Sequence, residues 1–313
     1  SEKRLFINRH GLPEAYLQQA SLWFDPMIEN LVTHQKEAKK TLVIGINGCQ
    51  GSGKTTLADY VSSILKTHGL KSIAISLDDF YLSHEQRQKL SKDVHPLLAT
   101  RGVPGTHDIN LALATVNALK TKYDGLSIPR FDKAKDDRFP LDQWSKVDSP
   151  VDVIILEGWC LGVEAQGEQS LVQAVNQLES LYDAGGSWRD YVNQQIKHHY
   201  SSLWQQIDCL IMLQAPSFEC VYEWRLEQEK KLGQHHQHSH QQATNKIMSA
   251  DQIEHFIQFY ERLTRHSLVH LPERCQHVFV LNNQRLVVDH RQPKPFMFGA
   301  SFDRSTRQTV DDL

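Results

Sequence analysis

A glycine-rich segment matches the pattern G-x-x-x-x-G-K-[ST], and its residue types suit a phosphate-binding loop. Gly48, Gly51 and Gly53 allow positive φ angles and a close approach of anionic oxygens, so backbone N–H groups can converge on the α- and β-phosphates. Lys54 would reach the β- and γ-phosphates, and the Thr55 hydroxyl would complete the coordination of Mg²⁺. We therefore expect nucleotide binding by the following residues: Gly48, Cys49, Gln50, Gly51, Ser52, Gly53, Lys54, Thr55 and Thr56.

Three carboxylates stand where two apolar segments end, and magnesium-dependent phosphoryl transfer needs such groups. Asp78 and Asp79 follow the apolar segment 72–77, and Glu157 follows a β-branched one. One carboxylate can hold Mg²⁺ and a second can accept a hydroxyl proton. Adjacent aspartates are also common in solvated turns and helix caps, but strand ends beside a phosphate-binding loop favour a functional role. A buried glutamate is costly unless it is paired, so we expect Glu157 to join Thr55 in the metal site.

Two loops rich in Gly, Pro and charged residues indicate an anionic acceptor. Arginine reads carboxylates and phosphates through two parallel hydrogen bonds. His107 and Asp108 lie on the first loop, where His107 is equally compatible with ordinary turn chemistry and Asp108 with a helix cap. The loop cations that suggest an acceptor carboxylate or phosphate are Arg101, Arg130, Lys133 and Arg138.

A charged helix predicted for 216–232 carries Arg225 and runs into a histidine-rich segment, 233–242. A cationic helix before a flexible connection suits a lid over the γ-phosphate, although an exposed helix laced with charge pairs is the simpler alternative. The histidines between 235 and 240 could bind a transition metal, but the surrounding glutamines and the lack of a carboxylate or cysteine favour a solvated loop. We therefore place a lid with a mobile His-rich loop at about 217–249.

Composition and charge point to one α/β domain with additions. The 313 residues are 40% hydrophobic, which supplies a large core. A net charge of -3 gives no basic field for nucleic acid, so we expect none as a partner. The chain shows neither an apolar leader nor a run of about 18 apolar residues, so we expect no membrane partner and a cytoplasmic location. The cysteines lack a C-x-x-C pair and are odd in number, which suggests free thiols: Cys49, Cys160, Cys209, Cys220 and Cys275.

The periodicity of apolar residues predicts strands that alternate with helices. Such alternation is typical of right-handed βαβ units, which build a parallel sheet with helices on both faces and active-site groups at the carboxyl ends of the strands. Residues 1–40 read as an N-terminal helical extension, and 41–313 as the catalytic domain. The expected strands are 41–47, 72–77, 151–156, 207–213 and, last, 277–281; the expected helices are 12–36, 55–68, 108–119, 216–232 and 249–268, with a long polar helical region from about 168 to 205.

Taken together, the motifs resemble a known family. The segments GINGCQGSGKTT, SLDDFYLS, RGVPGTHD, PRFDKAKDDR, ILEGWCLG and YEWRLEQE, in this order, resemble the glycerate kinases of the plant and fungal type and their bacterial relatives. These belong to the uridine kinase and pantothenate kinase group of P-loop kinases, and the resemblance covers about residues 40 to 285. It implies the α/β P-loop kinase fold, with ATP and Mg²⁺ as cofactors.

The resemblance also implies roles for single residues. Asp78 would be the general base, with Asp79 left open as the alternative, and Arg225 would be a lid arginine. The aromatic-Asp pair of the group falls on 131–132, but Asp136 replaces the group's usual histidine, which disfavours a nucleoside acceptor. The residues assigned to acceptor binding are Asp79, Tyr81, Arg101, His107, Asp108, Arg130, Asp132, Lys133 and Arg138.

The sequence therefore predicts an ATP-dependent kinase that phosphorylates a hydroxyl of a small carboxylated metabolite, with D-glycerate the favoured acceptor. Lys54, Asp78 and Arg225 are the expected catalytic residues, and Thr55 and Glu157 the expected metal ligands. Pantothenate or a nucleoside is the alternative acceptor. A nucleotide-dependent switch is a further alternative, but no guanine-reading N-K-x-D string occurs in the chain. The oligomeric state stays open.

Overall fold

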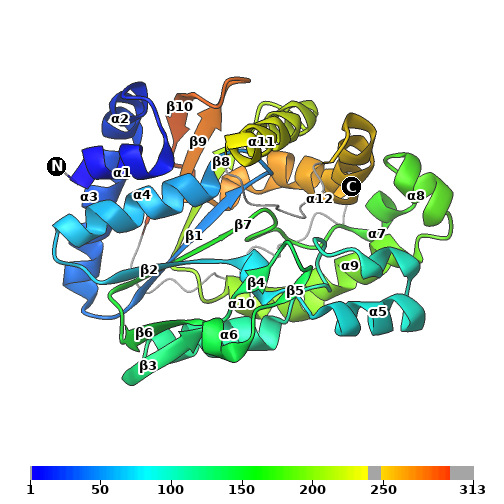
Figure 1. Cartoon of the computed structure of the whole chain (residues 1–313), viewed down its shortest axis with the longest axis horizontal. Coiled ribbons are helices and arrows are strands. Elements are labelled where there is room, and N and C mark those ends of the chain that lie inside the picture. Colours follow the sequence, from blue (N-terminus) through cyan, green and yellow to red (C-terminus); the bar gives the residue numbers. More distant parts are fainter. Residues whose placement is uncertain (1, 239–247, 297–313) are drawn as a thin grey trace, which may run out of the picture.

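A central sheet organises the structure, a computed structural model that describes residues 2–238 and 248–296 (Figure 1). The strands pair in parallel except for the last, which is antiparallel to its neighbour. This confirms the predicted α/β class with a mostly parallel sheet. Across the sheet the strands are β10 (Val287–Arg291), β9 (His277–Leu281), β8 (Cys209–Gln214), β1 (Leu42–Gly48), β7 (Val153–Gly158) and β2 (Ser72–Ser76).

Alternate side chains of each strand enter cores on opposite faces of the sheet. On β1, Leu42, Ile44 and Ile46 join one core, and Val43 joins the other. Every β1 residue is buried, as expected for a strand covered on both sides. The first core is shared with α1 (Glu2–His10), α3 (Asp25–Ala38), α4 (Lys54–Thr67) and α11 (Glu219–His238), and the second with α6 (Ile109–Leu119), α9 (Ser187–Gln195) and α10 (Ser201–Trp204).

The N-terminal segment is helical and packs on α4. It comprises α1, α2 (Ala15–Gln19), a π-helical turn (Ala20–Phe24) and α3. The Tyr60 hydroxyl of α4 donates to Asp25 of α3 at 2.7 Å, and the ring of Phe6 packs edge-on against Tyr60. The helix predicted for 12–36 is thus present as α2, the π-helical turn and α3, whereas α1 was not predicted; α1 and α3 contribute to the same core as α4.

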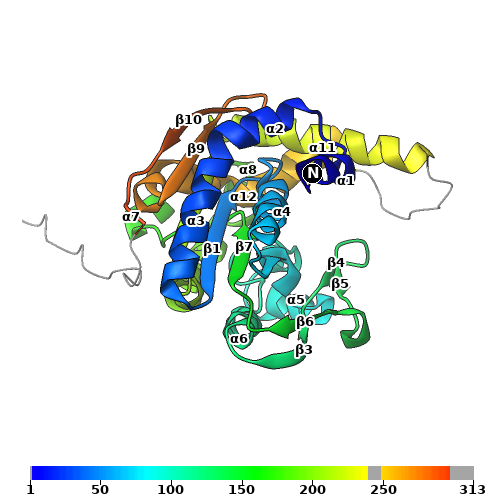
Figure 2. The same ribbon diagram turned by 90° about the vertical axis from the view of Figure 1, so that its left-hand side faces the viewer.

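Two antiparallel strand pairs interrupt the chain between α6 and β7. These are β3 (Tyr123–Ile128) with β6 (Ser145–Ser149), and β4 (Phe131–Asp132) with β5 (Asp137–Arg138). A short 3-10 helix, Leu141–Gln143, precedes β6. Figure 2 shows both pairs at the end of the molecule that also carries α5 (His84–Asp93) and α6. The β4–β5 hairpin carries most of the second cationic loop identified in the sequence.

The long helical region predicted for 168–205 is broken into several pieces. They are α7 (Glu168–Leu171), α8 (Gln177–Tyr182), α9, a π-helical turn (Ile196–Tyr200) and α10. The side chain of Asn176 caps α8, and Gly186 adopts φ 78° before α9. Both residues are N-caps, so each begins a new helix and the chain is interrupted before α8 and before α9.

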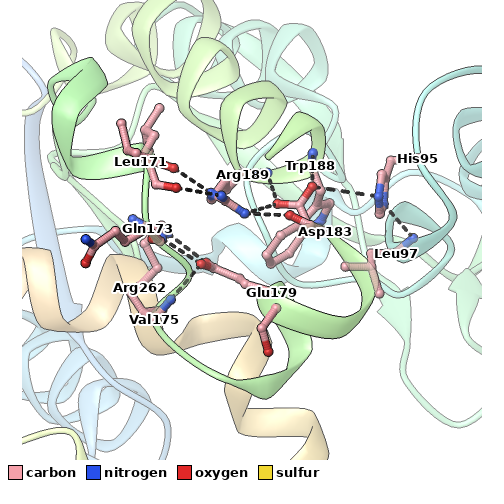
Figure 3. A network of polar contacts seen from close by, with 12 residues as sticks. His95, Leu97, Leu171, Gln173, Val175, Glu179, Asp183, Trp188, Arg189 and Arg262 are labelled. Carbon is pink, nitrogen blue, oxygen red and sulfur yellow. Dashed lines mark hydrogen bonds and ion pairs between the residues drawn. The ribbon is translucent and has the colours of Figure 1, made fainter. Parts of the chain in front are cut away.

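Two buried ion pairs hold these pieces together, and one of them ties α8 to α12 (Ala250–His270) (Figure 3). Arg262 of α12 lies 2.6 Å from Glu179 of α8, and Arg189 lies 3.0 Å from Asp183. The guanidinium groups also donate to backbone carbonyls, Arg262 to Ser170 among them. The two guanidinium groups thus have hydrogen-bond acceptors besides the carboxylates, which lowers the free-energy cost of burying these charges.

Two predictions near the C-terminus are wrong. The helix predicted to end at 232 continues as α11 to His238, so the part of the His-rich loop up to that residue is helical; 239–247 lies outside the described residues. Gly233 disfavours a helix by only about 1 kcal/mol, and no proline follows it to force an end. The strand predicted as the last, β9, is followed by the edge strand β10 after a turn in which Arg285 has φ 63°.

The helix predicted from Ser249 is confirmed. Ser249 forms a capping box with Gln252, and α12 follows. Within residues 2–238 and 248–296 we find no helix with the length and apolar character needed to cross a bilayer.

Candidate active site

The phosphate-binding loop joins the carboxyl end of β1 to α4. Gly51 and Gly53 have φ 77° and 94°, a region that favours glycine. A Cβ at Gly51 would lie 2.8 Å from the Cβ of Trp224 in α11, whereas one at Gly53 would meet no atom within 4 Å. No side chain caps the first turn of α4. The first N–H groups of α4 therefore lack a side-chain cap, which fits an anionic ligand.

Two buried polar atoms beside this loop lack a partner within the described residues, as expected of groups that bind a nucleotide or a metal ion. The Oγ of Ser52 is buried without a hydrogen-bond partner among the described residues, as is Oε2 of Glu157. Burial raises the pKa of the Cys49 thiol to about 12, so the thiol stays protonated and unreactive at neutral pH. The part of Cys49 that suits phosphate binding is therefore its backbone N–H group. All five cysteines lie in the described part of the chain and are buried and free, as expected.

Glu157 lies between the two strands that carry the other site residues. On β7 it is level with Ile46 of β1 and Ser76 of β2. Its Oε1 accepts a hydrogen bond from Thr55 Oγ1 at 3.0 Å, and the residue is only 4% exposed. Burial raises the pKa of Glu157 and the Asp78 charge adds to this, against the opposing effect of Lys54.

Thr55 and Glu157 therefore form a pair of oxygen ligands suited to a hard cation, and the unpaired Oε2 of Glu157 supports this fit. No group of three or more His, Cys, Asp or Glu side chains within the described residues could hold a metal. Mg²⁺ commonly takes one or two protein ligands and completes its shell with phosphate oxygens and water. The two residues are enough for such a site.

Asp78 lies on a 3-10 turn (Leu77–Phe80) directly after β2. Its Oδ2 is 2.6 Å from Lys133 Nζ, and its Oδ1 accepts the Tyr81 hydroxyl at 3.0 Å. Burial alone would raise the pKa of Asp78, but the charge and hydrogen bond of Lys133, together with the charge of Lys54, hold it well below its usual range. Asp78 is therefore ionised at neutral pH, and it lies close enough to Lys54 for the charge of that lysine to stabilise it.

Asp79 faces the β4–β5 hairpin instead. Its Oδ1 accepts the backbone N–H of Phe131 at 3.3 Å and lies 3.8 Å from Arg130 Nε. Burial raises the pKa of Asp79, and the neighbouring charge of Arg130 opposes this. The two adjacent carboxylates have different partners, so Asp79 fixes the hairpin while Asp78 faces the lysines.

Tyr81 and His107 are brought together by a β-bridge between their loops. The two rings stack with centroids 4.4 Å apart. Tyr200 lies behind them: its hydroxyl accepts the Gly105 N–H at 2.9 Å and contacts His107 Nδ1 at 2.7 Å. Burial lowers the pKa of His107 to about 4, so this residue is neutral near pH 7. The stack positions the Tyr81 hydroxyl on Asp78.

Three of the residues assigned to the acceptor are engaged within the protein. Asp108 caps α6 by accepting from Leu111 N, and its other oxygen lies 3.1 Å from Arg138. The same arginine donates to the carbonyl of Tyr81 at 2.8 Å. Asp132 accepts the N–H groups of the hairpin turn. These side chains order the loops around Asp78, and their predicted contact with an acceptor stays a prediction.

Arg101 is held by Asp136, which is held in turn by Arg87, a residue that sequence reasoning missed. It forms an ion pair with Asp136, and its guanidinium lies 5.6 Å from the centre of the Phe131 ring. Asp136 also pairs with Arg87 at 2.9 Å, and Arg87 is completely buried. Arg87 is one of many charged residues in a polar helix, so its spacing gave no signal. Asp136 stands out in the motif, but its φ of 56° and its two arginine partners could not be predicted from the sequence.

A second pair of missed residues supports the same loop. Trp159 donates its indole N–H to the carbonyl of Gly102 at 3.0 Å, and its ring packs edge-on against Tyr260 of α12. Gly102 has φ 141°, and the ring of Tyr260 lies directly against it. Trp159 follows Glu157 closely in the sequence, which was the available signal.

Arg225 lies on α11, one residue after the Trp224 that packs on the phosphate-binding loop. Its guanidinium pairs with Glu229 and donates to Gln228 at 3.1 Å. Burial lowers the pKa of Arg225, and the nearby positive charge of Arg101 acts in the same direction. The structure therefore places Arg225 next to Trp224, which packs on the phosphate-binding loop, and within reach of the charge of Arg101; its role as a lid residue stays a prediction.

Comparisons with known proteins agree with this geometry. Residues 43–178 match the model of the phosphoribulokinase/uridine kinase family. The uncharacterized kinase mug58 of Schizosaccharomyces pombe is 31% identical over 281 residues, which cover 85% of this chain and 97% of that protein. The chloroplastic D-glycerate 3-kinase of Arabidopsis thaliana is 35% identical over 209 residues, which cover 62% of this chain but only 42% of that protein.

Among solved structures, the D-glycerate 3-kinase of Cryptococcus neoformans has a similar fold. It superposes with a TM-score of 0.73 at 28% sequence identity, covering 90% of this chain and 100% of that one.

Proposed function

Because this chain belongs to the phosphoribulokinase/uridine kinase family and is a small-molecule kinase, we propose that it transfers the γ-phosphoryl group of ATP to D-glycerate. The observation that carries this proposal is the set of cations around the Asp78 carboxylate. Lys133 contacts Asp78, Arg130 lies beside Asp79, and Arg101 stands over the same hairpin. An acceptor that carries a carboxylate next to its hydroxyl suits this arrangement, because the cations can bind the carboxylate while Asp78 binds the hydroxyl.

The nucleotide would occupy the loop between β1 and α4. Its phosphates would face the uncapped first turn of α4, Lys54 and the unpartnered Ser52 hydroxyl. Thr55 and Glu157 would hold Mg²⁺, which when bound neutralises charge on the phosphates. Arg225 would add positive charge from α11.

The acceptor would lie between Asp78 and the cationic loops. Asp78 would orient the acceptor hydroxyl and take its proton, a role that suits a carboxylate ionised at neutral pH. Arg101, Arg130 and Lys133 would bind the acceptor carboxylate. The buried stack of Tyr81 and His107 would keep the base in position.

The names of the relatives support glycerate, since a plant and a fungal protein with similarity to this chain are described as D-glycerate 3-kinases. A nucleoside is a weaker candidate. The position where the group has a histidine is Asp136 in this chain, and its carboxylate is occupied by Arg87 and Arg101. Pantothenate, which carries both a carboxylate and a hydroxyl, is the second candidate that the same cations favour.

An acceptor panel tests the proposal. ADP release is followed with Mg²⁺ and ATP in the presence of D-glycerate, pantothenate or uridine, with the Lys54→Ala variant as the blank. We expect release that depends on D-glycerate and is lost in the variant. Release with pantothenate or uridine but not with D-glycerate would assign the chain another acceptor.

A further inference from the structure

Lys133 pairs directly with the carboxylate that the proposed function uses as its base. Its Nζ lies 2.6 Å from Oδ2 of Asp78, and the second oxygen, Oδ1, accepts the Tyr81 hydroxyl at 3.0 Å. In this arrangement a hydroxyl occupies one oxygen of the base and a cation occupies the other. A hydroxyl of an acceptor that approaches Asp78 therefore has to displace one of the two.

The two partners of Asp78 differ in how firmly they are held. Tyr81 is 3% exposed, its ring stacks on His107, and its carbonyl accepts from Arg138. The Lys133 side chain is 61% exposed and flexible. The contact at Oδ1 is therefore fixed, and the contact at Oδ2 is exchangeable. Oδ2 is the oxygen that can be offered to an acceptor.

The backbone that carries Lys133 does not need to move for this exchange. The Asp132 carboxylate accepts the N–H groups of Ala134 and Lys135, which fixes the turn on either side of the lysine. At the base of the hairpin, Asp79 accepts the N–H of Phe131. Rotation of the lysine side chain alone is enough to uncover Oδ2.

We propose that Lys133 masks the base Asp78 until the carboxylate of the acceptor takes its place as partner of the lysine. This proposal rests on the proposed function, since it assigns Asp78 as the base and a carboxylate to the acceptor. A carboxylate that enters beside Arg101 and Arg130 offers Lys133 an alternative anion and leaves Oδ2 to the hydroxyl. An uncharged alcohol or a water molecule offers no anion, so the ion pair persists and the base stays covered.

The step that follows is an ordinary phosphoryl transfer. The hydroxyl proton of the acceptor passes to Oδ2 of Asp78, and its oxygen forms a bond to the γ-phosphorus of ATP. The bond from that phosphorus to the bridging oxygen breaks, and ADP leaves with the electron pair. Lys133 thereby links the charge of the acceptor to the availability of the base, which makes it a specificity-determining residue.

The first test compares Lys133→Met with the matched control Lys135→Met. Lys135 lies on the same hairpin, is 76% exposed and faces Asp132 rather than Asp78. Glycerol serves as the uncharged counterpart of D-glycerate. For Lys133→Met we expect kcat/KM to fall about tenfold or more with D-glycerate and to rise about threefold or more with glycerol. Lys135→Met should behave like the unmodified protein with both.

The second test uses no acceptor, so it does not depend on which acceptor is right. ATP hydrolysis with Mg²⁺ alone should rise about threefold or more in Lys133→Met and stay unchanged in Lys135→Met, because water then reaches an uncovered base. Unchanged or slower hydrolysis in Lys133→Met, together with no gain on glycerol, would overturn the proposal and leave Lys133 as a plain carboxylate ligand.

A further comparison separates this proposal from the choice of glycerate. If pantothenate is the acceptor, the uncharged partner is pantothenol, and the same opposite changes are expected with that pair. If D-glycerate is not phosphorylated, but Lys133→Met lowers kcat/KM with pantothenate and raises it with pantothenol, the masking by Lys133 is supported. If Lys133→Met lowers kcat/KM for both the charged acceptor and its uncharged counterpart, the masking by Lys133 is contradicted.

Discussion

Thr55 Oγ1 donates to Glu157 Oε1 across 3.0 Å, although the two residues are far apart in the sequence. The contact exists because β7 lies between β1 and β2, so that its last residues stand beside the phosphate-binding loop on one side and Asp78 on the other. The order of strands in the sheet thus brings Thr55, Glu157, Asp78 and the phosphate-binding loop together at one edge, where we propose the metal ligands and the base.

Removal of the Glu157 charge should weaken the metal site. For Glu157→Gln we expect kcat to fall about 10²-fold or more and the Mg²⁺ concentration for half-maximal rate to rise, because a carboxylate ligand is replaced by a neutral amide. Mg²⁺ titrations at saturating ATP measure both. A variant with the same Mg²⁺ dependence as the unmodified protein would show that Glu157 is not a ligand.

Asp78 and Asp79 should separate in their effects. Asp78→Asn should lower kcat by about 10²-fold or more and leave nucleotide affinity nearly intact. Asp79→Asn, which loosens the hairpin, should act mainly on the KM of the acceptor. Steady-state kinetics and nucleotide titrations provide the comparison, and equal losses of turnover and nucleotide affinity in Asp78→Asn would place that residue in the metal site.

The buried histidine His107 should make stability depend on pH in a defined window. Its folded pKa of about 4 lies below the value of about 6.5 in the unfolded chain, so between these pH values only the unfolded state binds the proton. The free energy of unfolding should therefore fall as the pH drops from about 6.5 to 4, by at most about 1.4 kcal/mol per pH unit from this group.

Denaturant unfolding of His107→Asn at several pH values measures this contribution. The slope with pH should be smaller than in the unmodified protein, whereas His199→Asn, at an exposed position, should leave the slope unchanged. The same slope in all three proteins would contradict a neutral, buried His107.

The ion pairs around α8 should matter for stability rather than for chemistry. Arg262→Ala leaves the buried Glu179 without its cation and should lower the free energy of unfolding by about 3–5 kcal/mol. Arg265→Ala, on the same helix but half exposed, should cost about 1 kcal/mol or less. Chemical denaturation measures both, and equal small losses would show that the pair in Figure 3 is not tightly held.

Much of the fold follows from local patterns in the sequence. The β1 run, the glycine loop and α4 could be predicted because apolar burial, positive φ and helix periodicity are all visible in one short stretch. The extension of α11 past Gly233 and the edge strand β10 could not, since one depends on the small helical cost of a single glycine and the other on pairing with β9.

The candidate site divides in the same way. Asp78 and Glu157 were identifiable because Asp78 closely follows an apolar strand and Glu157 lies at the end of one. The roles of Arg87, Asp136 and Tyr260 depend on contacts between distant segments, and their local sequence is that of any polar helix or loop. Likewise, the pairing of Lys133 with Asp78 is visible only in the folded chain, because the hairpin brings the lysine back to the end of β2.

Phosphorus NMR of the reaction products tests the central claim most directly. After incubation with Mg²⁺, ATP and D-glycerate, the account predicts ADP together with an equal amount of a phosphomonoester of glycerate, and neither in the Asp78→Asn variant on the same timescale. Inorganic phosphate as the sole new product, or ATP left intact while another acceptor is phosphorylated, would contradict the assignment of this site to glycerate.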